Sequence, residues 1–96
     1  MRVISKRKIL EFSKDHFESK TSLENWYRVV NKSEFSNFAE LKRAFPSADQ
    51  VDNMTVFNVS GNKFRLIVAI HYNRQIVYIR HILTHAEYDK NKWRKT

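Results

Sequence analysis

Apolar residues in the first half of the chain recur at the spacing of helices. Residues 2–4 form a short apolar start that could be an edge strand, and from Ser5 the pattern turns helical. A second segment carries a continuous apolar stripe at i, i+3, i+4 and i+7, formed by Leu23, Trp26, Tyr27 and Val30. We therefore predict that the chain begins with two amphipathic helices behind a short strand.

Capping signals indicate where two of the helices begin. Thr21 followed by Glu24 has the spacing of a capping box, in which each side chain satisfies a backbone amide of the first turn. A third, shorter helix is predicted from Asn37, with Glu40 three residues later. It stops at Pro46, because proline lacks the amide hydrogen that a continuing helix needs.

The periodicity changes after a polar connection, SADQVDN at 47–53. Three runs of strand length follow, rich in β-branched and aromatic residues: MTVFNV, FRLIVAI and IVYIRHI. The linker SGNK makes a tight hairpin in which Gly61 is expected to adopt a positive φ and Asn58 faces Arg65. The linker HYNRQ makes a second hairpin. Helices, an antiparallel meander and a short terminal helix predict one α+β domain over 1–96.

The register of the second hairpin decides which cations meet. If 73–74 are its central turn residues, Arg65 faces Ile82 and lies diagonal to Arg80 on the same face of the sheet. A slip of one residue would instead place His81 opposite Arg65. In both registers two cations share one end of the sheet. An arginine pair there favours a bound anion over two guanidinium groups that extend into solvent.

Composition narrows the class of protein. Of 96 residues, 42% are hydrophobic, and one glycine and one proline leave no room for a flexible linker. The absence of cysteine excludes a disulfide framework, a thiolate nucleophile and a cysteine-based zinc site. The longest apolar run, about seven residues, is far below the ~20 needed to cross a membrane, and the N-terminus lacks a signal peptide's apolar stretch. We expect a soluble cytoplasmic protein without a membrane partner.

Positive charge gathers in the second half of the chain. The sequence has 18 Lys and Arg against 10 Asp and Glu, a net charge of +8. Between Asp52 and Glu87 there is no carboxylate, whereas four basic residues and three histidines lie there. A surface of one sign attracts a polyanion, and nucleic acid is the first candidate. The plainer alternative is charge that serves solubility alone.

The segment YIRHILTHAEYD, at 78–89, crowds together groups that could cleave RNA. RNA carries its own nucleophile, the 2′-hydroxyl, so transesterification needs a base, an acid and cations for the transition state, and no metal ion. His85 can serve as base or acid, because imidazole groups titrate near neutral pH. Tyr88, on the same helical face, could stack on a base or pass a proton. Arg65 and Arg80 would hold the scissile phosphate.

The remaining candidates are less specific. Further contacts with the RNA backbone are expected from four basic residues, Lys63, Arg74, Lys90 and Lys92. Thr84 is a plausible N-cap, and Glu87 and Asp89 are more typical of charges near a helix N-terminus than of catalysts. Trp93 either anchors the last helix or stacks on RNA.

Three of the histidines are also considered for roles other than catalysis. His81 and His85 have the spacing of a metal pair, but without cysteines or a clear third ligand we expect no metal ion and no cofactor. His16 is expected on the surface of a helix.

Motifs along most of the chain resemble the HigB toxins of bacterial type II toxin–antitoxin modules. The family pattern runs FPSADxV, then VFNxxGNKxRLIVxIxY, then YIRxxxTHxEYD, and each part is present here in that order. The likeness extends to the N-terminal MRVIS and to the WYRVV segment. An ordered set of motifs of this length is much more specific than a single short signature.

This resemblance implies a fold, an activity and partners. The fold would be RelE-like, a small helical layer packed on an antiparallel sheet with a short C-terminal helix. The activity would be that of an mRNA interferase, an endoribonuclease that cleaves mRNA, typically on the translating ribosome, and arrests growth. The antitoxin would be a helix-turn-helix protein of the HigA type, which connects the toxin to operator DNA only indirectly.

The resemblance also carries over site residues. RelE-like sites use basic residues together with a tyrosine or histidine. On this chain those positions are Arg65 in GNKFR, Arg80 in YIR, and His85 and Tyr88 in THAEY, with Lys63 a weaker match.

The residues alone leave other classes of function open. A basic RNA- or ribosome-binding module without catalysis would keep the arginines but would have no need of His85. A scaffold protein would carry its charge for solubility and show no salt-sensitive binding to RNA. A DNA-binding regulator is less favoured, because no helix-turn-helix pattern is present and the basic excess lies in the strand half.

Overall fold

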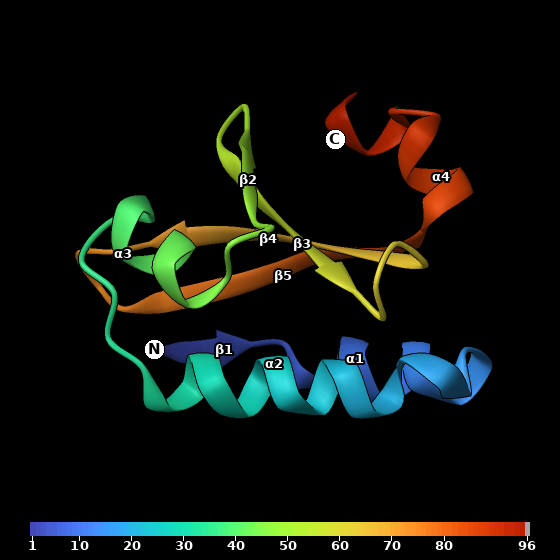
Figure 1. Cartoon of the computed structure of the whole chain (residues 1–96), viewed down its shortest axis with the longest axis horizontal. Coiled ribbons are helices and arrows are strands. Elements are labelled where there is room, and N and C mark those ends of the chain that lie inside the picture. Colours follow the sequence, from blue (N-terminus) through green and yellow to red (C-terminus); the bar gives the residue numbers. More distant parts are fainter. Residues whose placement is uncertain (96) are drawn as a thin grey trace.

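A computed structural model describes residues 1–95 of the chain. In this part of the chain the strands form a five-stranded sheet in the order β1-β5-β4-β3-β2, with two long helices against one face (Figure 1). The elements in chain order are β1 (Arg2–Ile4), α1 (Lys6–Asp15), the 3-10 turn η1 (Phe17–Ser19), α2 (Lys20–Lys32), α3 (Phe38–Ala44), β2 (Asp49–Val51), β3 (Met54–Val59), β4 (Phe64–His71), β5 (Ile76–Thr84), α4 (His85–Asp89) and the 3-10 turn η2 (Lys92–Lys95).

The predicted α+β class is confirmed, and the arrangement is consistent with a RelE-like fold. Strands β3, β4 and β5 form the predicted antiparallel meander. The sheet is mixed, however, because the predicted edge strand β1 pairs with β5 in parallel. Strand β2, at the other edge, lies inside the connection that the sequence marked as polar. Three residues are too few for an alternating pattern to be recognised.

The helical starts were predicted with mixed success. In α3, the Asn37 side chain accepts a hydrogen bond from the amide of Glu40 at 3.0 Å, as the sequence predicted. The capping box at Thr21 was wrong, because η1 leads directly into α2 and the helix is already under way at Lys20. The apolar stripe of α2 is nevertheless buried, with Leu23, Trp26 and Val30 in the core.

Strand β4 separates two apolar clusters. The larger lies between the sheet and the helices and takes Phe64, Leu66 and Val68 from this strand. The smaller lies on the opposite face and joins Ile67 with Val56 and Trp93. Because side chains alternate along a strand, Arg65 is directed to the second face, where α4 is found (Figure 1).

His16 is half-buried and packs against two aromatic residues of the larger cluster, Phe12 and Phe64. Its ring stacks on Phe12 at 4.1 Å between centroids and meets the edge of Phe64 at 5.5 Å. Its surface assignment was therefore wrong, since α1 ends just before it and the chain turns inward there.

The two hairpins have the predicted turns, but in the second hairpin both of the registers considered for Arg65, opposite Ile82 or opposite His81, are wrong. Gly61 has φ +68° and Asn58 faces Arg65, as expected. Next to the second turn, pairing also follows the prediction as far as Val68 opposite Ile79. A β-bulge then inserts Arg80 as an extra residue, so that Arg65 faces Leu83. A bulge of this kind leaves no sequence signal that a pairing rule can use.

No helix in residues 1–95 is long and apolar enough to cross a membrane.

Candidate active site

Strand β5 passes into α4 without a loop, and a reciprocal cap fixes the junction. The Glu87 amide donates to Thr84 Oγ1 at 3.2 Å, and the Thr84 amide donates to the Glu87 carboxylate at 2.9 Å. The hydrogen bond from the Thr84 amide is the main cause that lowers the pKa of Glu87. The cap expected at Thr84 is thus confirmed. The amide of His85 also donates to the carbonyl of Lys63 at 2.9 Å, which ties α4 to the β3–β4 turn.

Arg65 lies at the centre of the candidate site with only 9% of its surface exposed. Its Nη1 donates to the carbonyls of Asn62 and Phe64, each at 3.2 Å. Its Nη2 lies 3.2 Å from Nδ1 of His85, and Cζ lies 5.4 Å from the centroid of the Tyr88 ring. A buried guanidinium with fixed partners presents its donors in one orientation, as recognition of a phosphate requires.

The contact with Arg65 determines the tautomer of His85. A guanidinium has donors only, so Nδ1 must accept and the imidazole proton must sit on Nε2. That nitrogen lies 3.1 Å from Oδ2 of Asp89, to which it donates. The His85 imidazole therefore has a hydrogen-bonding partner at both nitrogens, Arg65 at Nδ1 and Asp89 at Nε2.

Asp89 was not among the predicted site residues. The sequence analysis assigned it only to the charge of a helix terminus, yet it is the partner that orients His85. The signal was present, because residues at i and i+4 of a helix face each other once α4 is known to begin at His85.

The Tyr88 ring packs between Trp93 and the Arg65 guanidinium. Its ring stacks on that of Trp93 at 5.2 Å with an interplanar angle of 15°, and Trp93 Nε1 donates to the Tyr88 carbonyl at 3.1 Å. Trp93 is 4% exposed and packs on Val56 and Ile67. Of the two interpretations of Trp93, the anchor is therefore confirmed, and a buried indole has no face available for RNA. The Arg94 guanidinium reinforces the anchor with two bonds to the Asp52 carboxylate, at 3.2 and 3.3 Å.

Arg80 and His81 lie at the bulge of β5. Neither is among the described contacts of the Arg65 side chain. Arg80 is exposed, and its carbonyl accepts from Lys8 Nζ at 3.3 Å. Burial lowers the pKa of His81, and the positive charges of Lys8 and Arg80 lower it further. The described contacts of the Arg65 side chain are with Asn62, Phe64, His85 and Tyr88. That Arg65 and Arg80 bind one anion together stays a prediction.

Two hollows extend from the bulge and meet at His81 and Leu83. One, of about 320 Å³, lies between α1 and β5 and includes Lys8 and Arg80. The other, of about 390 Å³, lies under the C-terminal segment and includes Lys90 and Lys92. Acidic side chains accompany the basic ones, with Glu11 and Asp15 in the first hollow and Glu87 in the second.

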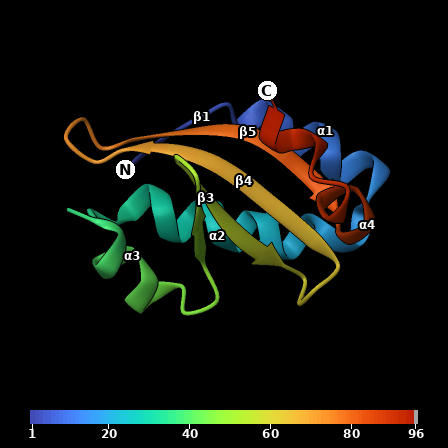
Figure 2. The same cartoon turned by 90° about the horizontal axis from the view of Figure 1, so that it is seen from above.

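The remaining predicted site residues fall into two groups. Lys63 is exposed in the β3–β4 turn. Its carbonyl accepts the hydrogen bond from the His85 amide, which places it next to the candidate site. Arg74 lies in the turn at the opposite end of the β4–β5 hairpin, far from α4 (Figure 2). In the described part of the chain no three His, Asp or Glu residues gather in a group that could hold a metal ion.

Comparison with known proteins identifies relatives that match almost the whole chain. The model of the HigB toxin family, described as the RelE-like toxic component of a toxin–antitoxin system, matches residues 19–91. The "mRNA interferase HigB" of Escherichia coli O6:H1 is 33% identical over 93 residues, covering 94% of this chain and 90% of that protein. The "mRNA interferase toxin HigB" of Escherichia coli K12 is 33% identical over 92 residues, covering 93% and 88%.

Proposed function

The chain belongs to the HigB family, the RelE-like toxic components of toxin–antitoxin systems, and we propose that it is an mRNA interferase that cuts mRNA by metal-independent transesterification. Two relatives that cover most of its length are named as mRNA interferases, which supports the substrate class. The observation that carries the chemistry is the chain of contacts from Arg65 through His85 to Asp89. It brings a phosphate-binding donor and a titratable base to one point.

Binding of the scissile phosphate would release the base. In the free protein, Arg65 Nη2 donates to His85 Nδ1. A phosphate oxygen, which carries negative charge, is the stronger acceptor, so RNA would draw this donor to itself. The Nδ1 lone pair then becomes available to the 2′-hydroxyl, and the substrate itself switches on the base.

The reaction that follows balances without a cofactor. His85 Nδ1 takes the proton of the 2′-hydroxyl, and the 2′-oxygen forms a bond to phosphorus. The bond from phosphorus to the 5′-oxygen breaks, and that oxygen takes a proton from an acid. The products are a 2′,3′-cyclic phosphate and a 5′-hydroxyl end. Arg65 would stabilise the charge that develops on the phosphorane-like oxygens.

Asp89 and Tyr88 complete the site. Asp89 accepts from Nε2–H, which orients the ring and would stabilise the imidazolium formed after proton transfer. Tyr88 has its ring packed against Trp93 and Arg65, so its hydroxyl is the part that a substrate can meet. Tyr88 is our candidate for the second proton-transfer group.

Individual basic side chains around the site would bind the rest of the RNA. Arg80 in the bulge would take a phosphate adjacent to the scissile one, and Lys63, Lys90 and Lys92 would hold the backbone on either side. Arg74 would contribute only to a substrate long enough to follow the β4–β5 hairpin to its far end. We propose that the substrate is mRNA on the translating ribosome, whose RNA suits a chain of net charge +8.

The family also implies a cognate antitoxin. We propose that it is a helix-turn-helix protein of the HigA type and that both proteins act in the cytoplasm. The toxin itself would then reach operator DNA only through the antitoxin.

Induced expression without the antitoxin tests the proposal. Wild type, His85→Gln and a matched control, His71→Gln, should be induced and the 5′ ends of cellular transcripts mapped. His71 is exposed at the opposite end of β4 and has no place in the mechanism. Wild type and the control should arrest growth and produce new mRNA ends, and His85→Gln should do neither. Arrest by all three with no new ends would favour a binding module without catalysis.

A further inference from the structure

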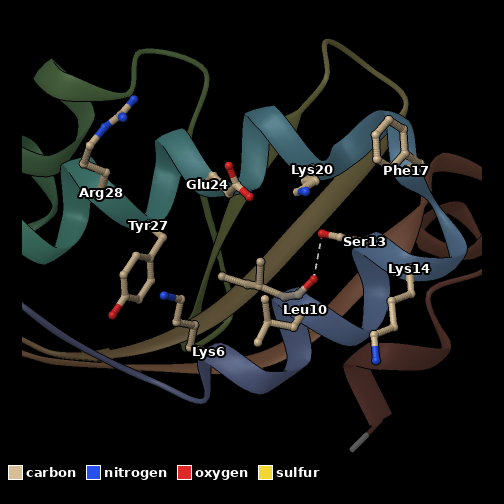
Figure 3. Close-up of a pocket in the computed structure, with 10 residues that line it drawn as sticks. Lys6, Leu10, Ser13, Lys14, Phe17, Lys20, Glu24, Tyr27 and Arg28 are labelled. Atoms are coloured by element: carbon tan, nitrogen blue, oxygen red, sulfur yellow. Dashed lines mark hydrogen bonds between the residues drawn. The ribbon is translucent and has the colours of Figure 1, made fainter.

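The outer surface of the helical layer carries large apolar side chains that the core does not use. Leu10 is 55% exposed and Phe17 is 76% exposed. Both line a groove of about 700 Å³ between α1 and α2, which the turn η1 closes at one end (Figure 3). Ile9 and Tyr27 contribute further apolar surface. Exposed apolar side chains that gather in a hollow of this size mark an interaction surface.

The rim of this groove is basic. Lys6, Lys14, Lys20 and Arg28 line it with a single acidic residue, Glu24, which leaves three positive charges in excess. Lys6 Nζ lies 4.7 Å from the centroid of the Tyr27 ring, and Lys20 Nζ lies 5.8 Å from that of Phe17. These ammonium groups thus lie over apolar rings and are available to carboxylates of a partner.

We propose that the α1–α2 groove is a docking site for an acidic amphipathic helix of the cognate antitoxin. The ten residues of α1 correspond to about 15 Å, which matches about three turns of a partner helix. Such a helix would place apolar side chains at i, i+3 or i+4, and i+7 beside Leu10 and Phe17, and glutamates or aspartates beside the lysines.

Other occupants fit the groove less well. RNA could contact the basic rim, but its charged backbone would then lie against the apolar floor of the groove. A second copy of this chain would bring two basic rims together, in a protein of net charge +8. An acidic amphipathic helix complements both the floor and the rim.

The groove is separate from the candidate active site. Its ten lining residues come from α1, η1 and α2 and include none from β4, β5 or α4. Docking there would leave Arg65 and His85 uncovered, so the groove would anchor the antitoxin without itself blocking the site. The inference rests on the family and its antitoxin, and it does not depend on the proposed ribonuclease activity.

A designed peptide tests the chemistry of the groove. The probe is a labelled helical peptide of about 18 residues with Leu at the apolar positions and Glu elsewhere, and its control has Lys in place of Glu. Fluorescence anisotropy with the full chain should show binding of the Leu/Glu peptide only. The double variant Leu10→Gln, Phe17→Ser should bind it about tenfold more weakly. The matched control Val29→Gln, at an exposed position of α2 outside the groove, should bind within about twofold of wild type.

Three results of the peptide measurement would overturn the proposal. The first is equal binding by wild type and the double variant, with both shown to be folded by thermal melting. The second is equal binding of the Leu/Glu and Leu/Lys peptides. The third is displacement of the peptide by a single-stranded RNA, which would make the groove a nucleic-acid surface. The His85→Gln variant should bind the peptide as wild type does, which separates this test from the test of ribonuclease activity.

Hydroxyl-radical footprinting of the purified toxin–antitoxin complex tests the occupant directly. Leu10, Phe17 and Tyr27 should become protected relative to the free toxin, while Val29 should keep its reactivity. Unchanged reactivity of the three groove residues would place the antitoxin elsewhere and overturn the inference. Sedimentation of the free toxin should give a monomer. A dimer that the Leu10→Gln, Phe17→Ser variant dissociates would assign the groove to a second copy instead.

Discussion

Arg65 Nη2 and His85 Nδ1 lie 3.2 Å apart, although the two residues are 20 positions apart in the sequence and belong to a strand and a helix. In this contact Nδ1 of the histidine faces a donor, while Nε2 lies 3.1 Å from the Asp89 carboxylate. In the mechanism we propose, a phosphate that binds this arginine would also expose the lone pair of the base. In the proposed mechanism, this residue pair would serve both in substrate binding and in the switch to the reactive state.

Replacement of Arg65 by Lys should reduce cleavage strongly even though the charge is kept. A lysine cannot donate at once to the Asn62 and Phe64 carbonyls and to a phosphate in a fixed fork. We expect a loss of about 100-fold in the single-turnover cleavage rate. Activity within about twofold of wild type would show that Arg65 contributes only its charge.

The lost hydrogen bonds should also lower stability. The Phe64 carbonyl is buried and the Asn62 carbonyl is partly buried, so loss of their shared donor should cost about 1–3 kcal/mol in the free energy of unfolding. Urea titration of the same variant checks that value, and cleavage should be measured well below the unfolding midpoint so that the two effects stay separate.

Asp89→Asn should impair cleavage without impairing binding of RNA. An amide can still accept from Nε2–H of His85 but does not stabilise the imidazolium that forms. We expect the rate of the chemical step to fall about tenfold, which corresponds to about 1.4 kcal/mol in the barrier, with the dissociation constant for RNA unchanged. The pH dependence of the cleavage rate should also change in this variant, which a purely structural role of Asp89 would not cause. Asp89→Glu should recover part of the rate.

The cap of α4 should control both stability and activity. Thr84→Ala removes the side-chain acceptor for the Glu87 amide, at a cost of about 1 kcal/mol in the free energy of unfolding. Because α4 has only five residues and positions His85, its fraying should also slow cleavage. Thr84→Ser keeps the hydroxyl and should resemble wild type in both measurements. A Thr84→Ala protein as active as wild type would show that the other contacts of α4 are sufficient to position His85.

His81 should make the protein less stable in mild acid. Burial lowers its pKa in the folded state, so the unfolded chain takes up a proton more readily as the pH falls through about 6.5. The free energy of unfolding should therefore drop between pH 7.5 and 5.5, and His81→Gln should reduce that drop. His71→Gln, at an exposed position, serves as the control. A pH dependence identical in wild type and His81→Gln would contradict this account.

The sequence was sufficient for the features that depend on local patterns. The stripe of α2, the Asn37 cap and the two hairpin turns each follow from the spacing of a few neighbouring residues. The junction of Arg65, His85 and Tyr88 was also found, because turn positions bring the ends of β4 and β5 together.

The features that the sequence did not predict depend on a single inserted residue in a strand or on a side-chain contact that only the structure shows. The bulge at Arg80 shifted the pairing so that Leu83, and neither Ile82 nor His81, faces Arg65. Asp89 became meaningful only once α4 was seen to begin at His85, four residues earlier. Arg74 carried a charge like the others but lies at the far end of its hairpin, so its contact with RNA stays a prediction.

The nature of the cut ends tests the central claim most directly. Purified wild type and His85→Gln, at equal concentration, should be added to ribosomes translating a defined mRNA, and the new ends identified chemically. Our account predicts a 2′,3′-cyclic phosphate and a 5′-hydroxyl for wild type, and no cleavage above background for His85→Gln. Equal cleavage by both proteins would remove His85 from the mechanism, and 3′-hydroxyl ends would exclude attack by the 2′-hydroxyl altogether.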